Sequence, residues 1–302
     1  MIKKLYNCSP KYIDKNTNIP VFKNQEINLN EFSITNAAEI HDNALKWLFD
    51  THKVNEEDLR RDMISRLNLK KGDKVLMTAT GAGNDIKYIM EKIGPTGTLY
   101  AQDYAKEMLF AAYERSKKEL DLNKLNIEFS VNDATDLPFD DESFDATFHF
   151  GGINLYNDVK KGIDEMHRVT KKGGKVVFGD EGLAHWLKKT EIGKALIVNN
   201  KLYDLEPPLE MLPHSAVDVK LTWVINNCFY LIEYTKNENQ WDVNIDIKHV
   251  GKRGGSIRTR FYGALEGIDP KLKENFYEKL SKEGRSRVDT IENLIKSYLD
   301  KK

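Results

Sequence analysis

The stretch that decides the fold is VLMTATGAGND, from Val75 to Asp85. A short apolar run ends in Gly81-Ala82-Gly83, and an amphipathic run from Asn84 to Lys92 follows it. This order predicts a strand, a tight turn and a helix, the first unit of a parallel α/β sheet. Glycines let the backbone approach a ligand because they lack a Cβ, and the helix start offers unpaired N–H groups. A glycine turn with a purely structural role is the alternative.

The turn does not match a dinucleotide site. The fingerprint G-x-G-x-x-G needs a third glycine, but Asn84, Asp85 and Ile86 follow Gly83. We also expect the Asp85 carboxylate to face a pyrophosphate, where a second negative charge is unfavourable. A cofactor made of a ribose, an adenine and an amino-acid tail has no phosphate and avoids this conflict. S-adenosylmethionine is therefore the predicted cofactor.

The composition sets bounds on the class of protein. The chain has 302 residues, enough for one large or two small domains, and 40% hydrophobic and 31% charged residues are ordinary for a soluble globular protein. A net charge of -1 argues against nucleic acid and anionic membranes as partners. Two cysteines suit a reducing compartment, and the sequence has no bilayer-spanning apolar run, signal peptide or metal-ligand cluster. We therefore predict a cytoplasmic protein without metal.

Strand and helix patterns alternate through the middle of the chain, which predicts an α/β fold with a doubly wound, mostly parallel sheet. The expected strands after the glycine turn cover 98–103, 126–131, a run ending at Phe150, and 175–179. Helical patterns from Asn36 and over 56–67 precede the first strand. Trp47 is expected in the core, with a substrate contact as the alternative. The predicted domains are an N-terminal arm or lid (1–35), a cofactor-binding domain (36–190) and an accessory region (191–302).

Polar residues at strand ends predict further cofactor contacts. Asp103 ends the second strand about twenty residues beyond the glycine turn, where an acidic residue accepts hydrogen bonds from both ribose hydroxyls. Tyr104 follows it and can lie against the adenine, and Asp133, after the third strand, can accept a hydrogen bond from the adenine amino group. A solvated aspartate at a strand end is the alternative for Asp103.

The order of motifs resembles that of the class I S-adenosylmethionine-dependent methyltransferases, most closely the ubiquinone/menaquinone C-methyltransferase-like group (methyltransferase type 11). The resemblance covers about residues 36–182 and rests on VLMTATGAGND, GTLYAQDYAKEML, NDATDLPFDDESFDATF and EMHRVTKKGGKVVF. It implies that the glycine turn meets the methionine tail, that 132–134 surround the adenine, and that Phe150 and Gly151 border the sulfonium. The residues expected at the cofactor are Ala79, Thr80, Gly81, Gly83, Asp103, Tyr104, Met108, Asn132, Asp133, Ala134, Phe150 and Gly151.

The chain departs from this family pattern at two positions. Met77 stands where the family usually has Asp or Glu, and Ala79 where it often has Gly. The usual acidic side chain helps to order the glycine turn. Its loss implies either that other contacts restore cofactor binding or that the fold keeps a pocket without transferring methyl groups.

Methyl transfer requires alignment of a nucleophile with the methyl carbon, and a base only if the acceptor loses a proton. His149, near the end of the fourth strand, and Asp180, at the end of the fifth, are the candidate catalytic residues. Tyr156 and His185 are candidates for substrate binding. A structural histidine or a loop aspartate is the alternative for the catalytic pair.

The chain changes character after about Gly182. Alternating or apolar runs over 217–225, 228–234, 243–247 and 257–261 predict an antiparallel sheet of its own, followed by two helices. Arg258 and Arg260 are expected on one side of a strand, where they can bind a carboxylate or phosphate of the substrate. Solvated arginines are the alternative.

These observations predict methyl transfer from S-adenosylmethionine to a small-molecule acceptor by direct displacement. Methylation of a peptide or protein and a non-catalytic cofactor-binding protein are the alternatives. The accessory region is expected to serve the substrate or dimerisation, which leaves a homodimer as an option.

Overall fold

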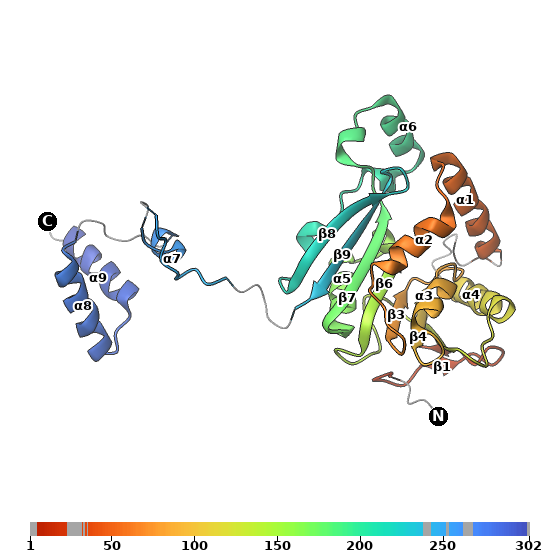
Figure 1. Ribbon diagram of the computed structural model, residues 1–302, viewed down its shortest axis with the longest axis horizontal. Helices are drawn as coiled ribbons and strands as arrows, with labels where there is room; N and C mark the ends of the chain where they lie inside the picture. Colours follow the sequence, from red (N-terminus) through yellow and green to blue (C-terminus); the bar gives the residue numbers. More distant parts are fainter. Residues whose placement is uncertain are drawn as a thin grey trace. The chain divides into compact units, whose positions relative to one another are not determined.

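The computed structural model describes residues 5–22, 32, 34, 36–237, 243–251, 254–261 and 268–300, the side chains of 260, 261 and 270 excepted. The chain forms two compact units, Met1–Trp241 and Asp242–Lys302 (Figure 1). The sequence placed the start of the accessory region at residue 191, and this boundary is wrong, because the second unit starts at Asp242. The predicted boundary lies inside the first unit, because strands beyond it join the main sheet.

In the described residues of the first unit, nine strands form one sheet in the order β1-β2-β5-β4-β3-β6-β7-β9-β8. The strands from β2 to β7 are parallel, and β1, β9 and β8 run antiparallel to their neighbours. The strands are β1 (Tyr12–Ile13), β2 (Pro20–Val21), β3 (Lys74–Thr78), β4 (Thr98–Asp103), β5 (Asn126–Val131), β6 (Phe144–Phe150), β7 (Thr170–Glu181), β8 (Ala216–Val224) and β9 (Phe229–Lys236).

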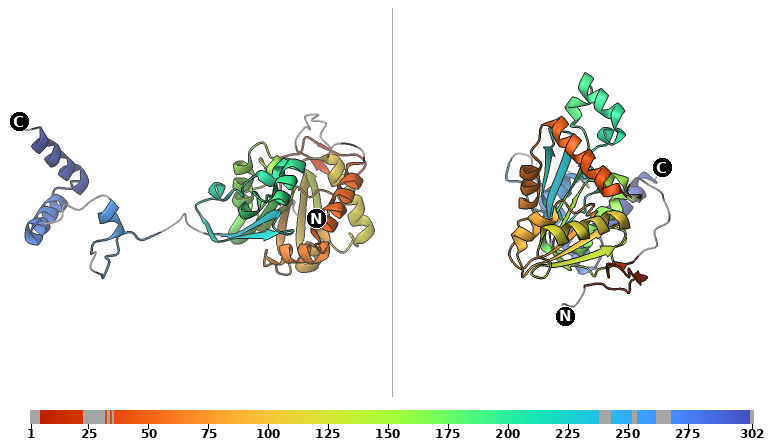
Figure 2. Two further views of the ribbon diagram at one scale, coloured as in Figure 1. Left: turned by 90° about the horizontal axis from the view of Figure 1, so that it is seen from above. Right: turned by 90° about the vertical axis from the view of Figure 1, so that its right-hand side faces the viewer.

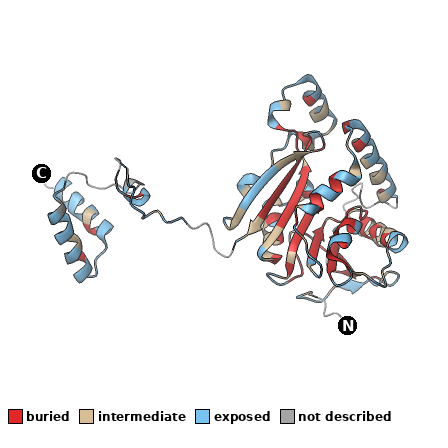
Figure 3. Ribbon diagram, in the orientation of Figure 1, coloured by how far each residue is buried: buried red, intermediate tan, exposed pale blue. Residues whose placement is uncertain are grey.

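Helices cover both faces of the sheet, so the predicted doubly wound architecture is confirmed (Figures 1 and 2). On one face, α2, α3 and α4 bury apolar side chains against the strands, while α5 packs against β7 and β9 on the other. Figure 3 shows the buried residues concentrated along the strands. The α-helices of this unit are α1 (Ala37–His52), α2 (Glu56–Ser65), α3 (Ile86–Ile93), α4 (Lys106–Glu119), α5 (Val159–Val169) and α6 (Glu191–Asn199).

The direction of winding changes between β3 and β6, which pair with each other in parallel register. In open α/β sheets, ligands bind beyond the carboxyl ends of the strands at such a switch point. The residues after β3 and β6 are the glycine turn and Gly151-Gly152. The sheet therefore places the two glycine-containing segments beside each other at the predicted ligand mouth.

The last two strands, β8 and β9, extend the main sheet and do not form the separate sheet that the sequence predicted. β9 pairs along β7 from Lys175↔Thr235 to Glu181↔Phe229. Its apolar residues Tyr230, Ile232 and Tyr234 complete the core under α5. β8 is an edge strand, and its pairing with β9 shifts between Val217 and Lys220, where Asp218 has a positive φ of 51°.

The N-terminal arm adds two short strands, β1 and β2, to the edge of the sheet opposite β8. β2 pairs with β5 at Val21↔Val131, and β1 pairs with β2. Tyr6 stacks on Phe139 with ring centroids 5.3 Å apart, so residues 5–22 pack against the sheet edge. Trp47, by contrast, is 56% exposed, and the prediction that it lies in the core is wrong. Phe49 and His52 are the buried residues on that half of α1.

The second unit contains α7 (Ile257–Phe261), α8 (Pro270–Lys282) and α9 (Arg287–Leu299). Asp269 and Ser286 cap the last two helices by accepting from backbone N–H groups. The strand predicted over 257–261 is wrong, since this segment is helical, and the described residues 243–247 are likewise not a strand. Arg258 and Arg260 therefore do not lie on a strand, and the side chain of Arg260 lies outside the described residues.

Candidate functional site

The glycine turn between β3 and α3 is held in shape by its neighbours. Ala79, Gly81 and Gly83 all have positive φ angles, and the Thr80 N–H donates to the carbonyl of Gln102 on β4 at 2.9 Å. A Cβ at Gly83 would lie 2.9 Å from the Cβ of Ala112 on α4. The absence of a Cβ at Gly83 therefore lets α4 pack closely against the turn. In a dinucleotide fingerprint, the third glycine permits close packing of a similar kind.

Asp103 fixes this turn through its carboxylate. Oδ2 accepts the Gly81 N–H and Oδ1 accepts the Ala105 N–H, both at 2.7 Å. Burial raises the pKa of Asp103 to about 6, although the backbone N–H donors oppose that rise. The expectation that Asp103 supports only a ribose is therefore incomplete, because this side chain also ties β4 to the glycine turn.

Asp85 does not carry the free charge that the sequence suggested. Its carboxylate accepts a hydrogen bond from the buried Arg60 guanidinium of α2 at 2.8 Å. The two side chains are 6% and 5% exposed, so the pair is buried. The argument against a pyrophosphate from the Asp85 charge is therefore wrong, because Arg60 neutralises it.

The expected adenine end lies beyond β5. The Asn132 N–H donates to the carbonyl of Asp103 at 3.1 Å, and Asp133 Oδ1 accepts from the backbone N–H of Thr135 at 2.8 Å. A cavity of about 460 Å³ opens here, lined by Asn132 and Asp133 on one side and by Lys11 and Phe22 of the N-terminal arm on another. Asn132 Oδ1 is buried without a hydrogen-bond partner among the described residues. A nucleoside that donates hydrogen bonds fits these acceptors.

The other predicted cofactor residues gather at the same edge. Met108 lies under the turn, since its Cε is 3.8 Å from the position of a Cβ on Gly81, and Ala134 is buried. Tyr104 is 38% exposed beside Asp103. A Cβ on Gly151 would meet no atom within 4 Å, so the backbone after β6 borders open space.

The two candidate catalytic residues are completely buried. His149 Nδ1 lies 3.0 Å from Thr78 Oγ1 and 3.3 Å from the Tyr156 hydroxyl, and burial lowers the pKa of His149 to about 4. Asp180 Oδ2 accepts the N–H groups of Gly152, at 3.1 Å, and Asn154, at 2.6 Å. Asp180 thus holds the loop after β6 in place, and His149 is a neutral group beneath the mouth.

The other predicted substrate residues are His185, in the first unit, and Arg258 and Arg260, in the second. His185 lies in the short helix η3 (His185–Leu187), with its side chain 79% exposed and 3.5 Å from a carboxylate oxygen of Glu206. Arg258 belongs to the second unit, where its guanidinium donates to both carboxylate oxygens of Asp246 at 2.6 and 3.1 Å. Of the two predicted substrate residues in the first unit, Tyr156 lies at the strand ends and His185 does not.

A row of aromatic rings that the sequence did not indicate starts at Phe150. Phe150 stacks on Phe229, with centroids 5.8 Å apart, and Phe229 meets Tyr203 edge to face at 6.2 Å. Tyr203, from the short helix η4 (Lys201–Asp204), in turn meets the His52 ring at 6.5 Å. We call these four residues the aromatic row. They come from four distant segments, so no local pattern could have revealed them.

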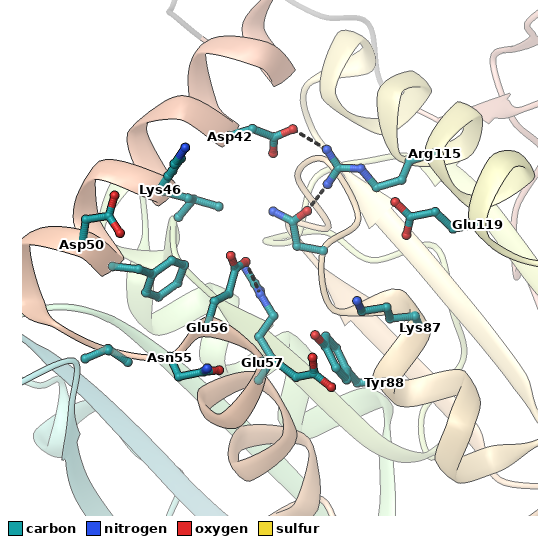
Figure 4. Close-up of a pocket in the computed structure, with 15 residues that line it drawn as sticks. Asp42, Lys46, Asp50, Asn55, Glu56, Glu57, Lys87, Tyr88, Arg115 and Glu119 are labelled. Atoms are coloured by element: carbon teal, nitrogen blue, oxygen red, sulfur yellow. Dashed lines mark hydrogen bonds and ion pairs between the residues drawn. The ribbon is translucent and has the colours of Figure 1, made fainter.

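A larger cavity of about 700 Å³ lies among α1, α2, α3 and α4 (Figure 4). Arg115 of α4 reaches across it, donating to Asn84 in the glycine turn and to Asp42 on α1. Its lining is rich in charged side chains of both signs. Arg115 therefore links α1 to the turn that the cofactor is expected to contact.

The fold is that of the Rossmann-like S-adenosylmethionine-dependent methyltransferases, and comparisons with known proteins show which family of them the chain resembles. The model of the ubiE/COQ5 methyltransferase family matches residues 46–181. The 2-phytyl-1,4-beta-naphthoquinone methyltransferase of Arabidopsis thaliana is 30% identical over 184 residues, which are 59% of this chain and 69% of that protein. The chain therefore belongs to the ubiE/COQ5 methyltransferase family, and the predicted recognition and cofactor are confirmed at this level.

A bacterial relative matches over a shorter stretch. The demethylmenaquinone methyltransferase of Oceanobacillus iheyensis is 36% identical over 130 residues, 43% of this chain and 51% of that protein. The chain thus spans about half the length of this relative. Among solved structures, phosphoethanolamine N-methyltransferase 2 of Haemonchus contortus, in complex with S-adenosyl-L-methionine, has a TM-score of 0.53 at 17% identity, covering 68% of this chain and 59% of that one. This likeness supports the fold.

Proposed function

We propose that this protein transfers a methyl group from S-adenosylmethionine to a small aromatic acceptor of the quinol type. Support comes from two relatives that are named for naphthoquinone-type substrates, and from the aromatic row that begins at the expected sulfonium position. Phe150 is the half-buried ring of this row, whereas Phe229, Tyr203 and His52 are buried. The names of these two relatives are the observation that carries this choice of acceptor.

The residues at the strand ends have separate tasks in this proposal. Asp103 accepts hydrogen bonds from the ribose, Asn132 and Asp133 receive the adenine, and the glycine turn takes the methionine tail. The cofactor supplies an electrophilic methyl group. Asp180 keeps Gly152 and Asn154 in position, so the loop after β6 is rigid where the acceptor approaches. Catalysis by positioning requires such rigidity.

Four further predictions stay part of this proposal. We expect a cytoplasmic protein that does not bind nucleic acid, and a homodimer remains an option. None of the described helices is long and apolar enough to cross a bilayer. Residues 242–302 are expected to serve the acceptor or a second subunit.

Calorimetric titration with S-adenosylmethionine and with NAD tests the cofactor, and transfer of a radiolabelled methyl group to anaerobically reduced 1,4-naphthoquinone tests the reaction. We expect heat only with S-adenosylmethionine and label in the naphthohydroquinone. Cofactor binding without transfer to this acceptor or to longer-chain quinols would favour the non-catalytic alternative. Label in a peptide fraction instead would favour the peptide alternative.

A further inference from the structure

The N-terminal arm, residues 5–22, is fastened to both ends of the loop that follows β5. At the start of this loop, the Phe22 N–H donates to the carbonyl of Val131, the last residue of β5, at 2.9 Å. At its end, the Asn7 N–H donates to the carbonyl of Pro138 at 3.0 Å. The arm therefore brackets the loop that is proposed above to receive the adenine.

A third attachment joins the arm to the segment that follows β4. Asp14 Oδ2 lies 2.9 Å from Nζ of Lys106, the first residue of α4, three positions after Asp103. The hydrogen bond from Lys106 lowers the pKa of Asp14 to about 2, so the ion pair is charged at neutral pH. Oδ1 of the same carboxylate accepts the N–H groups of Asn16 and Thr17 at 3.0 and 3.1 Å, which shapes the arm's own turn. The arm thus contacts the segments after β4 and β5, two neighbouring strands.

The arm and the loop after β5 enclose the cavity of about 460 Å³ described above. Four arm residues line it, namely Asn7, Cys8, Lys11 and Phe22. Asn132 lines another side and is 1% exposed. Its Nδ2 donates to Ser130 Oγ at 3.1 Å, whereas its Oδ1 has no hydrogen-bond partner among the described residues. A buried acceptor without a donor costs free energy, so the cavity favours a ligand that donates a hydrogen bond.

We propose that the N-terminal arm is the outer wall of the adenine site and slows release of the cofactor, an assignment that rests on the placement of the adenine proposed above. The adenine amino group is the donor that suits Asn132 Oδ1, and an adenine bound there covers the wall that contains Cys8. The ion pair of Asp14 with Lys106 then resists opening of this wall. The arm precedes residues 46–181, which the family model matches, so the family pattern does not supply this contribution.

Cys8 reports whether the cofactor fills the cavity. Its thiol is exposed, whereas Cys228, the other cysteine of the chain, is buried and provides an internal control. The probe is S-adenosylhomocysteine, and labelling of the full chain by N-ethylmaleimide is followed at each cysteine by peptide mass spectrometry. At about ten times its calorimetric Kd, S-adenosylhomocysteine should slow the labelling of Cys8 about tenfold, because a tenth of the sites stay empty. An unchanged rate while the ligand is bound overturns the assignment.

The reverse experiment fills the cavity first. Protein that carries the maleimide adduct at Cys8 should bind S-adenosylhomocysteine about tenfold more weakly, because the adduct occupies the space of the adenine. Cys8→Ser keeps the size of the side chain without an adduct and should bind within about twofold of the wild type. Equal affinity of the labelled and unlabelled proteins overturns the assignment.

Asp14→Asn tests the attachment to α4, because the amide keeps an Oδ1 acceptor for the turn and removes the charge that faces Lys106. We expect the dissociation rate of S-adenosylhomocysteine to rise by up to about fivefold. Asp121→Asn, beyond the other end of α4, is the matched control. Asp121 also accepts the N–H two residues further on and pairs with a lysine, Lys124, at 2.9 Å, so its loss should leave the rate unchanged. Equal rates for the two variants overturn the role of the arm in retaining the cofactor.

These measurements need no methyl acceptor, so their outcome is separate from that of the transfer reaction. Protection of Cys8 in a protein that methylates no quinol supports the role of the arm and overturns the choice of acceptor. Transfer to the naphthohydroquinone by a protein whose Cys8 stays unprotected overturns the role of the arm alone. A protein that binds no S-adenosylhomocysteine overturns both.

Discussion

Asp103 shows how one side chain can serve both the fold and the ligand. Its two carboxylate oxygens already hold the Gly81 and Ala105 N–H groups, and each oxygen has a further lone pair for a ribose hydroxyl. Because burial raises the pKa of Asp103 to about 6, a proton competes with the ribose below that pH. Cofactor binding should therefore depend on pH.

We expect the affinity for S-adenosylmethionine to be about tenfold weaker at pH 5 than at pH 7.5, because only about a tenth of Asp103 is ionised at pH 5. Asp103→Asn should weaken binding at pH 7.5 by about 1.5–3 kcal/mol and abolish this pH dependence. Calorimetry at both pH values measures the effect, with the exposed Asp140→Asn as control. An affinity that is flat from pH 5 to 7.5 in the wild type would remove Asp103 from the cofactor site.

For single residues, the sequence indicates which positions can contact a ligand, but not which side chains they pair with. The end of β4 made Asp103 a candidate, whereas the ion pair between Asp85 and Arg60 joins residues 25 positions apart, one before α3 and the other on α2. Burial and charge pairing depend on these long-range neighbours.

At the scale of elements, α1 is tied to the cofactor turn by Arg115, which donates to Asn84 and Asp42. Ala37 of α1 also packs with Ala82 and Met108 beside the turn. The position of α1 and the shape of the turn are therefore coupled through one guanidinium.

Arg115→Leu keeps much of the side-chain stem and removes this link. We expect the affinity for S-adenosylmethionine to fall by up to about fivefold, as for a partly exposed ion pair, with faster amide exchange in α1. Lys117→Leu, on the same helix with Glu114 as its ion-pair partner, should change neither quantity. Equal effects of the two substitutions would mean that Arg115 contributes only surface charge.

A second link attaches α2 to the antiparallel strands. Arg66, which follows α2, pairs with Glu233 of β9, whose side chain is 6% exposed. Arg66→Met should lower the free energy of unfolding by about 2–3 kcal/mol, since it leaves a buried carboxylate with Lys220 as its remaining partner. Arg61→Met, on the same helix with exposed partners, should cost less than about 1 kcal/mol in urea titrations. A cost for Arg66→Met as small as that of the control would show that the pair does not anchor β9.

Local sequence patterns predicted most helices and strands, but they did not predict which strands pair with each other. β4 and β5 begin and end where the sequence placed them, because turn residues bound both strands. β8 and β9 were predicted as strands, but the alternation of apolar and polar residues does not reveal that β9 pairs with β7. Ile257, Thr259 and Phe261 alternate as in a strand, yet this short segment is a helix, since three alternating residues are a weak signal.

At the scale of the whole molecule, all the predicted cofactor residues belong to the first unit, and its last strand ends at Lys236. Removal of residues 242–302 should therefore leave a folded protein that binds S-adenosylmethionine within about twofold of the full chain. Circular dichroism and calorimetry check both statements. Failure of the shortened chain to fold would contradict the division into units, and loss of methyl transfer alone would support an acceptor role for residues 242–302.

The irregular pairing of β8 has a consequence for behaviour at high concentration. An edge strand with a row of unpaired backbone groups is a template on which another chain can add, and natural sheets block it with bulges and charges. Asp218 sits at the shift in register with a positive φ, and Lys220 follows it. The edge is thus unsuited to docking a second sheet, which protects the protein from aggregation by strand addition. A homodimer, if it forms, must use a surface other than a continuous sheet across β8.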